Sequence, residues 1–220
     1  VASMGSNLLI VMPGSLTSGG LRMGSGAQMT LTLDDAYAIE RECPAVAAVA
    51  PIVNGVAQIV FGNQNWSTAV QGTTPGILAA RDITLVSGRP FTDQDVRSAT
   101  KVTLLGQTVV ENLFGANDPV GQIVRISKVP FTVVGVLAEK GQSLMGHDQD
   151  DLVYIPVTTA QKRIFGTHFA GSVRSILIKA GSAADMERAE QQITELLKQR
   201  HRISPRGELD FSIRNLTQLL

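Results

Sequence analysis

Three histidines and a short run of aspartates are the side chains of this sequence that could do catalytic or metal chemistry. They are His147, His168, His201, Asp148, Asp150 and Asp151. A serine hydrolase would need a nucleophile near one of the histidines, and no G-x-S-x-G elbow occurs in the chain. We therefore predict no catalytic residue and expect that this chain is not an enzyme.

The pairing of His147 with the aspartate run is the one pattern that resembles a metal site. Hard cations need several converging oxygen ligands, and the run lacks the glycine and terminal glutamate of an EF-hand loop. Zinc requires more than one histidine or cysteine. We interpret the run as a solvated acidic turn before a strand, and we predict neither a metal nor a cofactor.

Two further reactive residues lie at the ends of predicted helices. His201 stands between Arg200 and Arg202, where cations suit a helix C-terminus, and we interpret it as a solvated surface residue. Cys43 is the single cysteine, which excludes an internal disulfide. Its place just before Pro44, at the end of an amphipathic helix, predicts a buried structural thiol.

The glycine-rich segment 13–26 could be mistaken for a phosphate-binding loop, but it matches neither the P-loop pattern nor G-x-G-x-x-G before a helix. We interpret it as a mobile surface loop that orders against a partner. A small hydrolase or binding protein that uses this loop is an alternative that no nucleophile–base spacing supports. Trp66 is interpreted as a half-buried hairpin residue. Site residues are thus predicted as none, and the partner-binding residues are unknown.

Bulk composition narrows the class of protein. The 220 residues are 44% hydrophobic and 17% charged, which is typical of a globular chain with a real core. Lys+Arg 19 against Asp+Glu 19 leaves no net positive field, which argues against nucleic-acid binding. No apolar run approaches the ~20 residues that span a bilayer. The abrupt ends of the chain are expected to be cut from a longer protein.

Apolar periodicity predicts a βαβ unit at each end of the chain. The first has a strand over 8–12, a helix begun by Thr32 with Asp35 in a capping box, and an extended stretch over 46–59 broken by Pro51 and Gly55. The second has a strand over 173–178, a helix after Ser182 and a closing strand over 209–213. We expect an α+β fold in which residues 1–59 and 172–220 form one discontinuous domain.

The middle of the chain, residues 60–171, is predicted to be an inserted lobe dominated by β-hairpins. One hairpin turns at 62–65, and short helices are expected at 107–114 and 158–165. The strongest pattern lies over 114–137, FGANDPVGQIVRISKVPFTVVGVL. Turn residues there precede a predicted strand over 123–126. Ser127-Lys128 then forms a second turn, which leads into another predicted strand over 131–137.

The order of several motifs resembles the extracytoplasmic domain of MacB-type ABC transporter permeases. The turn DPVG followed by F-x-V-V-G-V-L is similar to that family, as are Gly88-Arg89-Pro90-Phe91 with Asp95 and the run Asp148-Gln149-Asp150-Asp151 before Ile155-Pro156-Val157-Thr158-Thr159. The resemblance covers nearly the whole chain. It implies a discontinuous βαβ "porter" subdomain with an inserted β-rich "sabre" subdomain.

What the resemblance implies about function is a non-catalytic, mechanical role. Such a domain would transmit ATP-driven motion and engage a MacA-type periplasmic adaptor, for export of macrolides, peptides or other substrates through a TolC-type outer-membrane channel. It would lie on the periplasmic side of the bacterial inner membrane, anchored by transmembrane helices absent from this sequence. The full-length transporter would be a homodimer and the isolated fragment a monomer. Lipoprotein-releasing and FtsX-type permeases, which share the topology, are the alternative.

Overall fold

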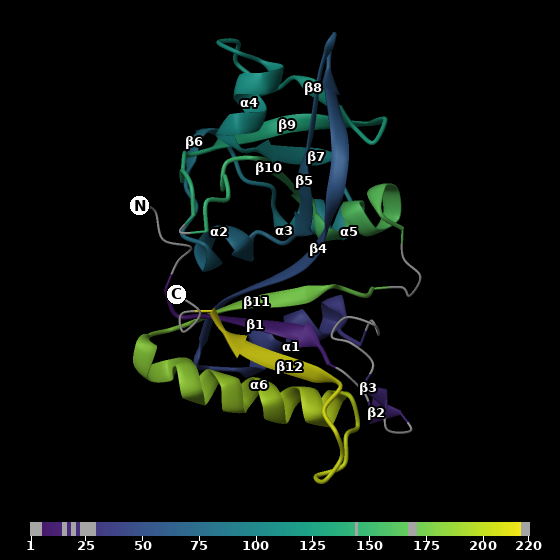
Figure 1. The fold of residues 1–220 in the computed structure, drawn as a ribbon, viewed down its shortest axis with the longest axis vertical. Helices are drawn as coiled ribbons and strands as arrows, with labels where there is room; N and C mark the ends of the chain where they lie inside the picture. The colour runs from purple at the N-terminus through teal and green to yellow at the C-terminus, as the bar shows by residue number, and fades with distance from the viewer. Residues whose placement is uncertain are drawn as a thin grey trace. The chain divides into compact units, whose positions relative to one another are not determined.

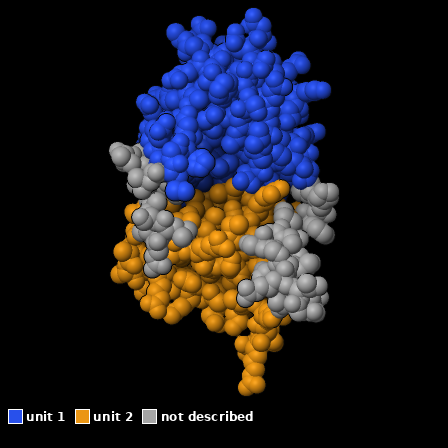
Figure 2. Space-filling model, viewed as in Figure 1, with its two compact units in different colours: residues 1–4, 53–167 blue, residues 5–52, 168–220 orange. Residues whose placement is uncertain are grey.

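A computed structural model describes residues 6–14, 17–18, 21–22, 30–143, 145–166 and 171–216. Most of the predicted loop 13–26, together with His168 and the last four residues, lies outside these described residues. The chain divides into two compact units (Figure 2). Unit 1 comprises Val1–Met4 and Val53–Thr167, and unit 2 comprises Gly5–Ile52 and His168–Leu220. Each unit is described by itself.

Unit 2 contains an antiparallel sheet in the order β12-β1-β11-β4 (Figure 1). Its strands are β1 (Leu8–Pro13), the first part of β4 (Val46–Phe61), β11 (Ser175–Ala180) and β12 (Phe211–Asn215). The first predicted βαβ unit contributes β1 and β4, and the second contributes β11 and β12. Strand β11 lies between β1 and β4, and β1 lies between β11 and β12. Each βαβ unit therefore has a strand of the other unit inserted between its own two strands. The predicted α+β class is confirmed. Two short strands, β2 (Thr17–Ser18) and β3 (Leu21–Arg22), pair with each other.

Two helices of unit 2 pack against each other, α1 (Leu33–Glu42) and α6 (Met186–Arg200), the latter preceded by the 3₁₀ turn Ala183–Asp185. The predicted capping box of α1 is confirmed, because Asp35 N–H donates to Thr32 Oγ1 and Thr32 N–H donates to Asp35 Oδ2, both at 3.1 Å. Helix α6 buries Ala189, Ile193 and Leu197. These contacts fix the start of α1 and the inner face of α6.

Unit 1 is a ring of strand pairings that runs β4–β5–β10–β7–β9–β8 and back to β4 (Figure 1). The strands are β5 (Gln64–Thr73), β6 (Leu85–Gly88), β7 (Val102–Leu105), β8 (Ile123–Ile126), β9 (Val129–Leu137) and β10 (Leu152–Pro156). Strand β6 pairs with β9 outside the ring. The expectation of a lobe built mainly of hairpins is only partly right, because β5/β10 and β7/β9 are parallel pairs.

Strand β4 continues through Pro51 and Gly55, so the predicted breaks at these residues are wrong. Pro51 is tolerated because the first part of β4 pairs with β11 alone among the described strands and needs no second ladder there. Gly55 lies under the ring of Phe165: a Cβ atom at this position would sit 2.4 Å from Phe165 Cε1. The glycine therefore makes room for a side chain and does not end the strand.

Short helices cover the ring of unit 1. They are α2 (Gly76–Ala80), α3 (Asp93–Ser98), α4 (Gln107–Leu113), α5 (Val157–Thr159) and a π-helical turn at Ala160–Ile164. The helices predicted at 107–114 and 158–165 are thus confirmed to within one residue. The core of this unit includes Phe114, Phe131 and Ile126, and Phe61 stacks on Phe114 with ring centroids 4.1 Å apart.

The predicted hairpin of β8 and β9 is confirmed, and its two-residue turn has an unusual backbone. Ser127 and Lys128 have φ values of 48° and 70°, the left-handed values that a type I′ turn requires. We expect Ser127→Asn combined with Lys128→Gly to raise the free energy of unfolding by roughly 1 kcal/mol, because these residues adopt positive φ at little cost. Urea unfolding measures this change in the free energy of unfolding. Lys101→Gly, at a position without positive φ, is the control and should not stabilise.

Candidate functional site

A polar cluster of unit 2 gathers four charged side chains from three elements. His201, which caps α6, places Nε2 2.8 Å from Asp35 Oδ2 and Nδ1 2.7 Å from Asp210 Oδ1. Arg200 Nε donates to Asp35 Oδ1 at 2.8 Å. Thus α1, α6 and the residue before β12 meet at one imidazole ring, which also packs against the ring of Phe211 in a T-shaped arrangement.

The interpretation of His201 as a solvated surface residue is wrong. Its side chain is only 10% exposed, and that of Asp35 is 3% exposed. Hydrogen bonds from the ring to Asp35 and then to Asp210 raise the pKa of His201 to about 9, against the opposing effect of burial. Burial alone would raise the pKa of Asp35, but the bonds from His201 and Arg200 hold it below its ordinary value.

This geometry assigns a structural role to the cluster. Both ring nitrogens face carboxylate oxygens, which only accept hydrogen bonds, so the ring must be an imidazolium that donates from both sides. A ring with both nitrogens engaged cannot accept a proton from a substrate. The sequence carried no signal for this cluster, because Asp35 and His201 are 166 residues apart.

The aspartate run of unit 1 is held by hydrogen bonds. Asp150 is 6% exposed and accepts from the backbone N–H groups of Lys140 and Gly141 at 2.7 and 2.9 Å. Asp151 Oδ1 accepts from Trp66 Nε1 at 2.8 Å and from Thr68 Oγ1 at 2.6 Å. The interpretation of these two aspartates as part of a solvated turn is therefore wrong, whereas the half-buried Trp66 is confirmed.

The neighbouring residues of the run do not complete a metal site. Asp148 Oδ2 accepts from Thr108 Oγ1 at 2.6 Å, and His147 is exposed. Across the part of the chain that the structure describes, no three His, Cys, Asp or Glu side chains converge closely enough to hold a metal ion. The carboxylates of this run hold β10 and the preceding loop in place.

Cys43 is buried as predicted, at 3% exposure. Burial, followed by the nearby charge of Glu42, raises the pKa of its thiol to about 11, so the reactive thiolate is scarce at neutral pH. The backbone N–H of Cys43 donates to Ile39 O at 3.1 Å and closes α1. This thiol is packed in the interior of unit 2 at the end of α1.

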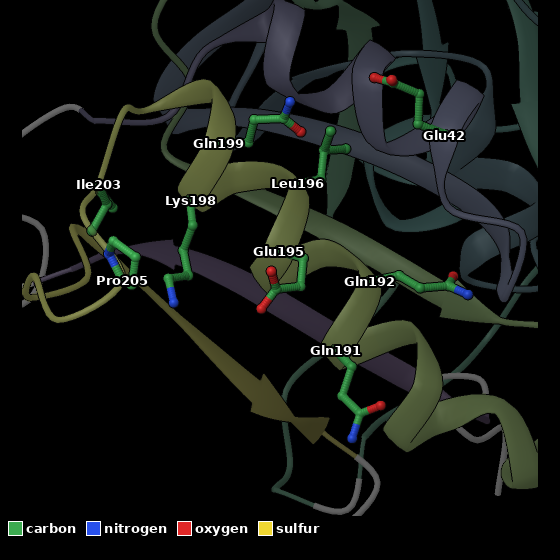
Figure 3. Close-up of a pocket in the computed structure, with 9 residues that line it drawn as sticks. All are labelled: Glu42, Gln191, Gln192, Glu195, Leu196, Lys198, Gln199, Ile203 and Pro205. Carbon is green, nitrogen blue, oxygen red and sulfur yellow. The ribbon is translucent and has the colours of Figure 1, made fainter.

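A groove in unit 2 lies along α6, bordered by the end of α1 and by the segment that follows α6 (Figure 3). It encloses about 840 Å³ and is lined by Glu42, Gln191, Gln192, Glu195, Leu196, Lys198, Gln199, Ile203 and Pro205. Leu196 and Ile203 are half-buried there, while Glu195 and Gln199 are exposed. Its wide opening, and a lining in which most residues are polar or charged, suit a surface contact rather than an enclosed small molecule.

No helix in the described ranges has the length and apolar content to cross a bilayer.

Comparison with known proteins agrees with this architecture. The family profile of the MacB-like periplasmic core domain matches residues 1–196. Proteins called "Macrolide export ATP-binding/permease protein MacB" are 37% identical over 270 residues in Syntrophobacter fumaroxidans and 36% identical over 220 residues in Bdellovibrio bacteriovorus. Both alignments cover 100% of this chain, which spans 38% and 33% of those relatives.

Solved structures show the same fold. The periplasmic region of MacB from Actinobacillus actinomycetemcomitans superposes with a TM-score of 0.77 at 25% identity, covering 98% of this chain and 92% of that one. The extracellular domain of the ABC-type transporter YknZ from Gram-positive bacteria superposes with a TM-score of 0.73 at 19% identity, covering 95% and 100%. The chain therefore belongs to the family of MacB-like periplasmic core domains of ABC transporter permeases.

Proposed function

We propose that this chain is a non-catalytic extracytoplasmic domain that transmits ATP-driven motion and engages a periplasmic adaptor. Its cargo would be macrolides, peptides or other substrates, exported through an outer-membrane channel. The names of its relatives as macrolide export proteins support the export role. Because the chain spans about a third of those relatives, the ATPase and the membrane helices of this proposal belong to the longer protein.

The observation that carries the proposal is the pairing of β1 with β12. These strands are antiparallel neighbours, with Leu9 opposite Asn215 and Pro13 opposite Phe211. The start of β1 and the end of β12 therefore lie side by side at one end of a single sheet. A shift of the flanking segments would act directly on this sheet, which supports the lever and porter-like role that we propose for unit 2.

The buried cluster supports the rigidity that a lever needs. His201 and Arg200 tie α6 to α1 through Asp35, and His201 ties both to the start of β12 through Asp210. The main-chain carbonyl of Asp210 also accepts from Gly14 N–H at 2.6 Å, next to the end of β1. Displacement at the sheet would thus carry both helices with it.

Unit 1 receives the sabre-like role of presenting a surface to the adaptor. The strands of unit 1 pair in a ring, which leaves few unpaired strand edges, and the core inside the ring consists of packed hydrophobic side chains. The predicted limits of the two subdomains, 1–59 with 172–220 and 60–171, remain part of this proposal, and the compact units divide close to them, at 52/53 and 167/168.

Excision of unit 1 in the full-length permease tests the proposal. A short Gly/Ser linker can replace residues 53–167, because Ile52 O accepts from Arg174 N–H at 2.9 Å and Arg174 follows the second cut by only a few residues of chain. We expect the excised permease to lose adaptor capture and export while hydrolysing ATP. Retained adaptor capture and export would contradict the proposal. Capture of a lipoprotein carrier in place of the adaptor would favour the lipoprotein-releasing alternative.

A second variant separates coupling from binding. Flexible Gly/Ser insertions before β1 and after β12 leave both units unchanged but loosen their link to the flanking segments. We expect adaptor capture to persist and export to fall to background. Export at the original rate with both insertions in place would show that the domain does not act as a lever.

A further inference from the structure

Strands β5, β4, β8 and β9 of unit 1 are neighbours in the ring, and they share an outward face (Figure 1). Their inward side chains include Ile59, Val70 and Ile126, which pack in the core of this unit. Val109 of α4 and Ala160 of the π-helical turn belong to the same core, so these two elements lie on the inner side. Side chains along a strand alternate between its two faces, so the residues between the core positions point outward. We call the outward side chains of β5, β4, β8 and the first half of β9 the open face, because they are exposed or half-buried.

Strand pairing makes the open face continuous. Val60 of β4 lies between Asn65 of β5 and Arg125 of β8. Arg125 in turn lies opposite Pro130 of β9. One row of side chains therefore crosses all four strands. A surface held in register by backbone pairing is already formed before a partner arrives, which lowers the cost of binding.

The open face is poor in charge. Amide and hydroxyl side chains supply most of its polar groups, namely Asn54, Gln58, Asn65, Ser67, Gln71 and Thr132. Its apolar side chains are Val56, Val60, Ala69, Ile123 and Pro130. Among these described residues Arg125 is the one charged side chain, and none is acidic.

This composition differs from that of a face built only to meet water. A surface suited to solvent carries roughly 25–35% charged residues of both signs. The centre of a protein–protein interface is instead depleted of Lys, Glu and Asp and enriched in Arg. Two apolar side chains of the open face are also strongly exposed, Val56 at 73% and Ile123 at 59%. The open face therefore has the composition of an interface.

The same features select the kind of partner. A sheet face has no walls to enclose a small cargo molecule, and one arginine is too little charge to hold an anionic membrane or a nucleic acid. A second copy of this chain would present the same face, on which no described residue offers a carboxylate to Arg125. We propose that the open face docks a different protein, whose contact surface is largely uncharged and places a carboxylate against Arg125. This inference rests on the proposed function, under which that protein is the periplasmic adaptor.

Val56→Glu in the full-length permease tests the uncharged part of the face. The substitution puts a carboxylate where the partner offers apolar and neutral groups, so it should weaken adaptor binding at least about tenfold. Val86→Glu is the matched control, because Val86 is 60% exposed but lies on β6, outside the open face. It should leave the affinity within about twofold of the original. Titration of a purified MacA-type adaptor onto the immobilised permease measures both.

Arg125→Glu tests the single charge. It sets a carboxylate against the carboxylate expected on the partner, so adaptor binding should again weaken at least about tenfold. Lys162→Glu is the control: it makes the same change of charge at an exposed position of unit 1 outside the open face, and it should bind the adaptor as the original does. Urea unfolding of the four 220-residue variants should match that of the original chain, which separates lost binding from lost folding.

An affinity that both Val56→Glu and Arg125→Glu leave unchanged would overturn the open face as the docking site, while adaptor capture by the original permease would leave the proposed function standing. Controls that weaken binding as much as these variants would overturn it equally. Loss of permease self-association with adaptor binding intact would assign the face to a second copy and contradict the proposal. An original permease that binds no adaptor at all would refute the proposed function and this inference together.

Discussion

Asp35→Ala is expected to lower the free energy of unfolding by about 3–4 kcal/mol. The substitution removes the carboxylate that receives His201, Arg200 and the backbone N–H of Thr32. It leaves a cation facing a buried gap, since the side chain of Asp35 is only 3% exposed. The cost combines the loss of a helix cap with the loss of one partner of a buried ion pair, and denaturant unfolding followed by circular dichroism measures it.

Asp34→Ala is the matched control, because Asp34 lies in the same helical turn but is exposed. It should change the free energy of unfolding by less than roughly 0.5 kcal/mol. Equal effects of the two substitutions would mean that only the charge near the helix N-terminus matters, and that the contacts of Asp35 with His201 and Arg200 add nothing.

The same cluster predicts how stability depends on pH. The pKa of His201 is raised in the folded chain to about 9 from 6.5, so its contribution is complete below pH 6.5 and is lost as pH rises through about 9. The loss amounts to ~3 kcal/mol at most. The pKa of Asp35 is lowered, so its contribution is present above 3.8 and is lost as pH falls through the folded value.

Denaturant midpoints of unfolding, measured between pH 6 and pH 10, test the predicted loss of stability at alkaline pH. His201→Gln should unfold at lower denaturant and lack the decline assigned to the imidazolium, because glutamine does not titrate. An unchanged slope in this variant would place the alkaline transition at another group.

Gly88→Ala is expected to be the other strongly destabilising substitution, by about 3 kcal/mol or more. Gly88 has a φ of 75°, and a Cβ atom there would sit 2.1 Å from Val134 O and 2.7 Å from Gly135 Cα. Both are backbone atoms of β9, which cannot rotate away. The contact matters because Arg89 N–H donates to the same Val134 O at 2.8 Å and directs the chain toward Phe91, which is 2% exposed.

Gly62→Ala separates backbone strain from the clash. Gly62 also has a positive φ, of 57°, but an added Cβ would meet nothing within 4 Å. Gly62→Ala should lower the free energy of unfolding by only the ~1–2 kcal/mol that an alanine in the left-handed conformation costs. If both variants lose the same free energy of unfolding, the close approach of β6 to β9 does not add to the cost of Gly88→Ala.

The motif Gly88-Arg89-Pro90-Phe91 with Asp95 was noted in the sequence through resemblance, and its physical role is local. Asp95 reaches back to Thr92 N–H at 2.9 Å and completes a capping box for α3, and Arg89 pairs with it at 3.5 Å. A capping box could be predicted from spacing alone. The clash that requires Gly88 could not, because Val134 is brought there by strand pairing.

Local patterns in the sequence were enough to predict the secondary structure of much of this protein. The start of α1 follows from Thr32 and Asp35, the end of that helix from Pro44, and the β8–β9 hairpin from alternation around Ser127-Lys128. Each depends on interactions within a few residues, which composition and spacing encode directly. The predicted break of β4 at Gly55 failed because the reason for that glycine is Phe165, far along the chain.

Tertiary structure alone decided which polar side chains matter. Read locally, His201 looked like one more cation at a helix end, and Asp150 like part of a solvated turn. Only the interleaving of the two βαβ units brings Asp35, Arg200, His201 and Asp210 together, and only the packing of β10 buries Asp150. Burial and charge pairing are set by residues distant in sequence, so no short window of this chain contains them.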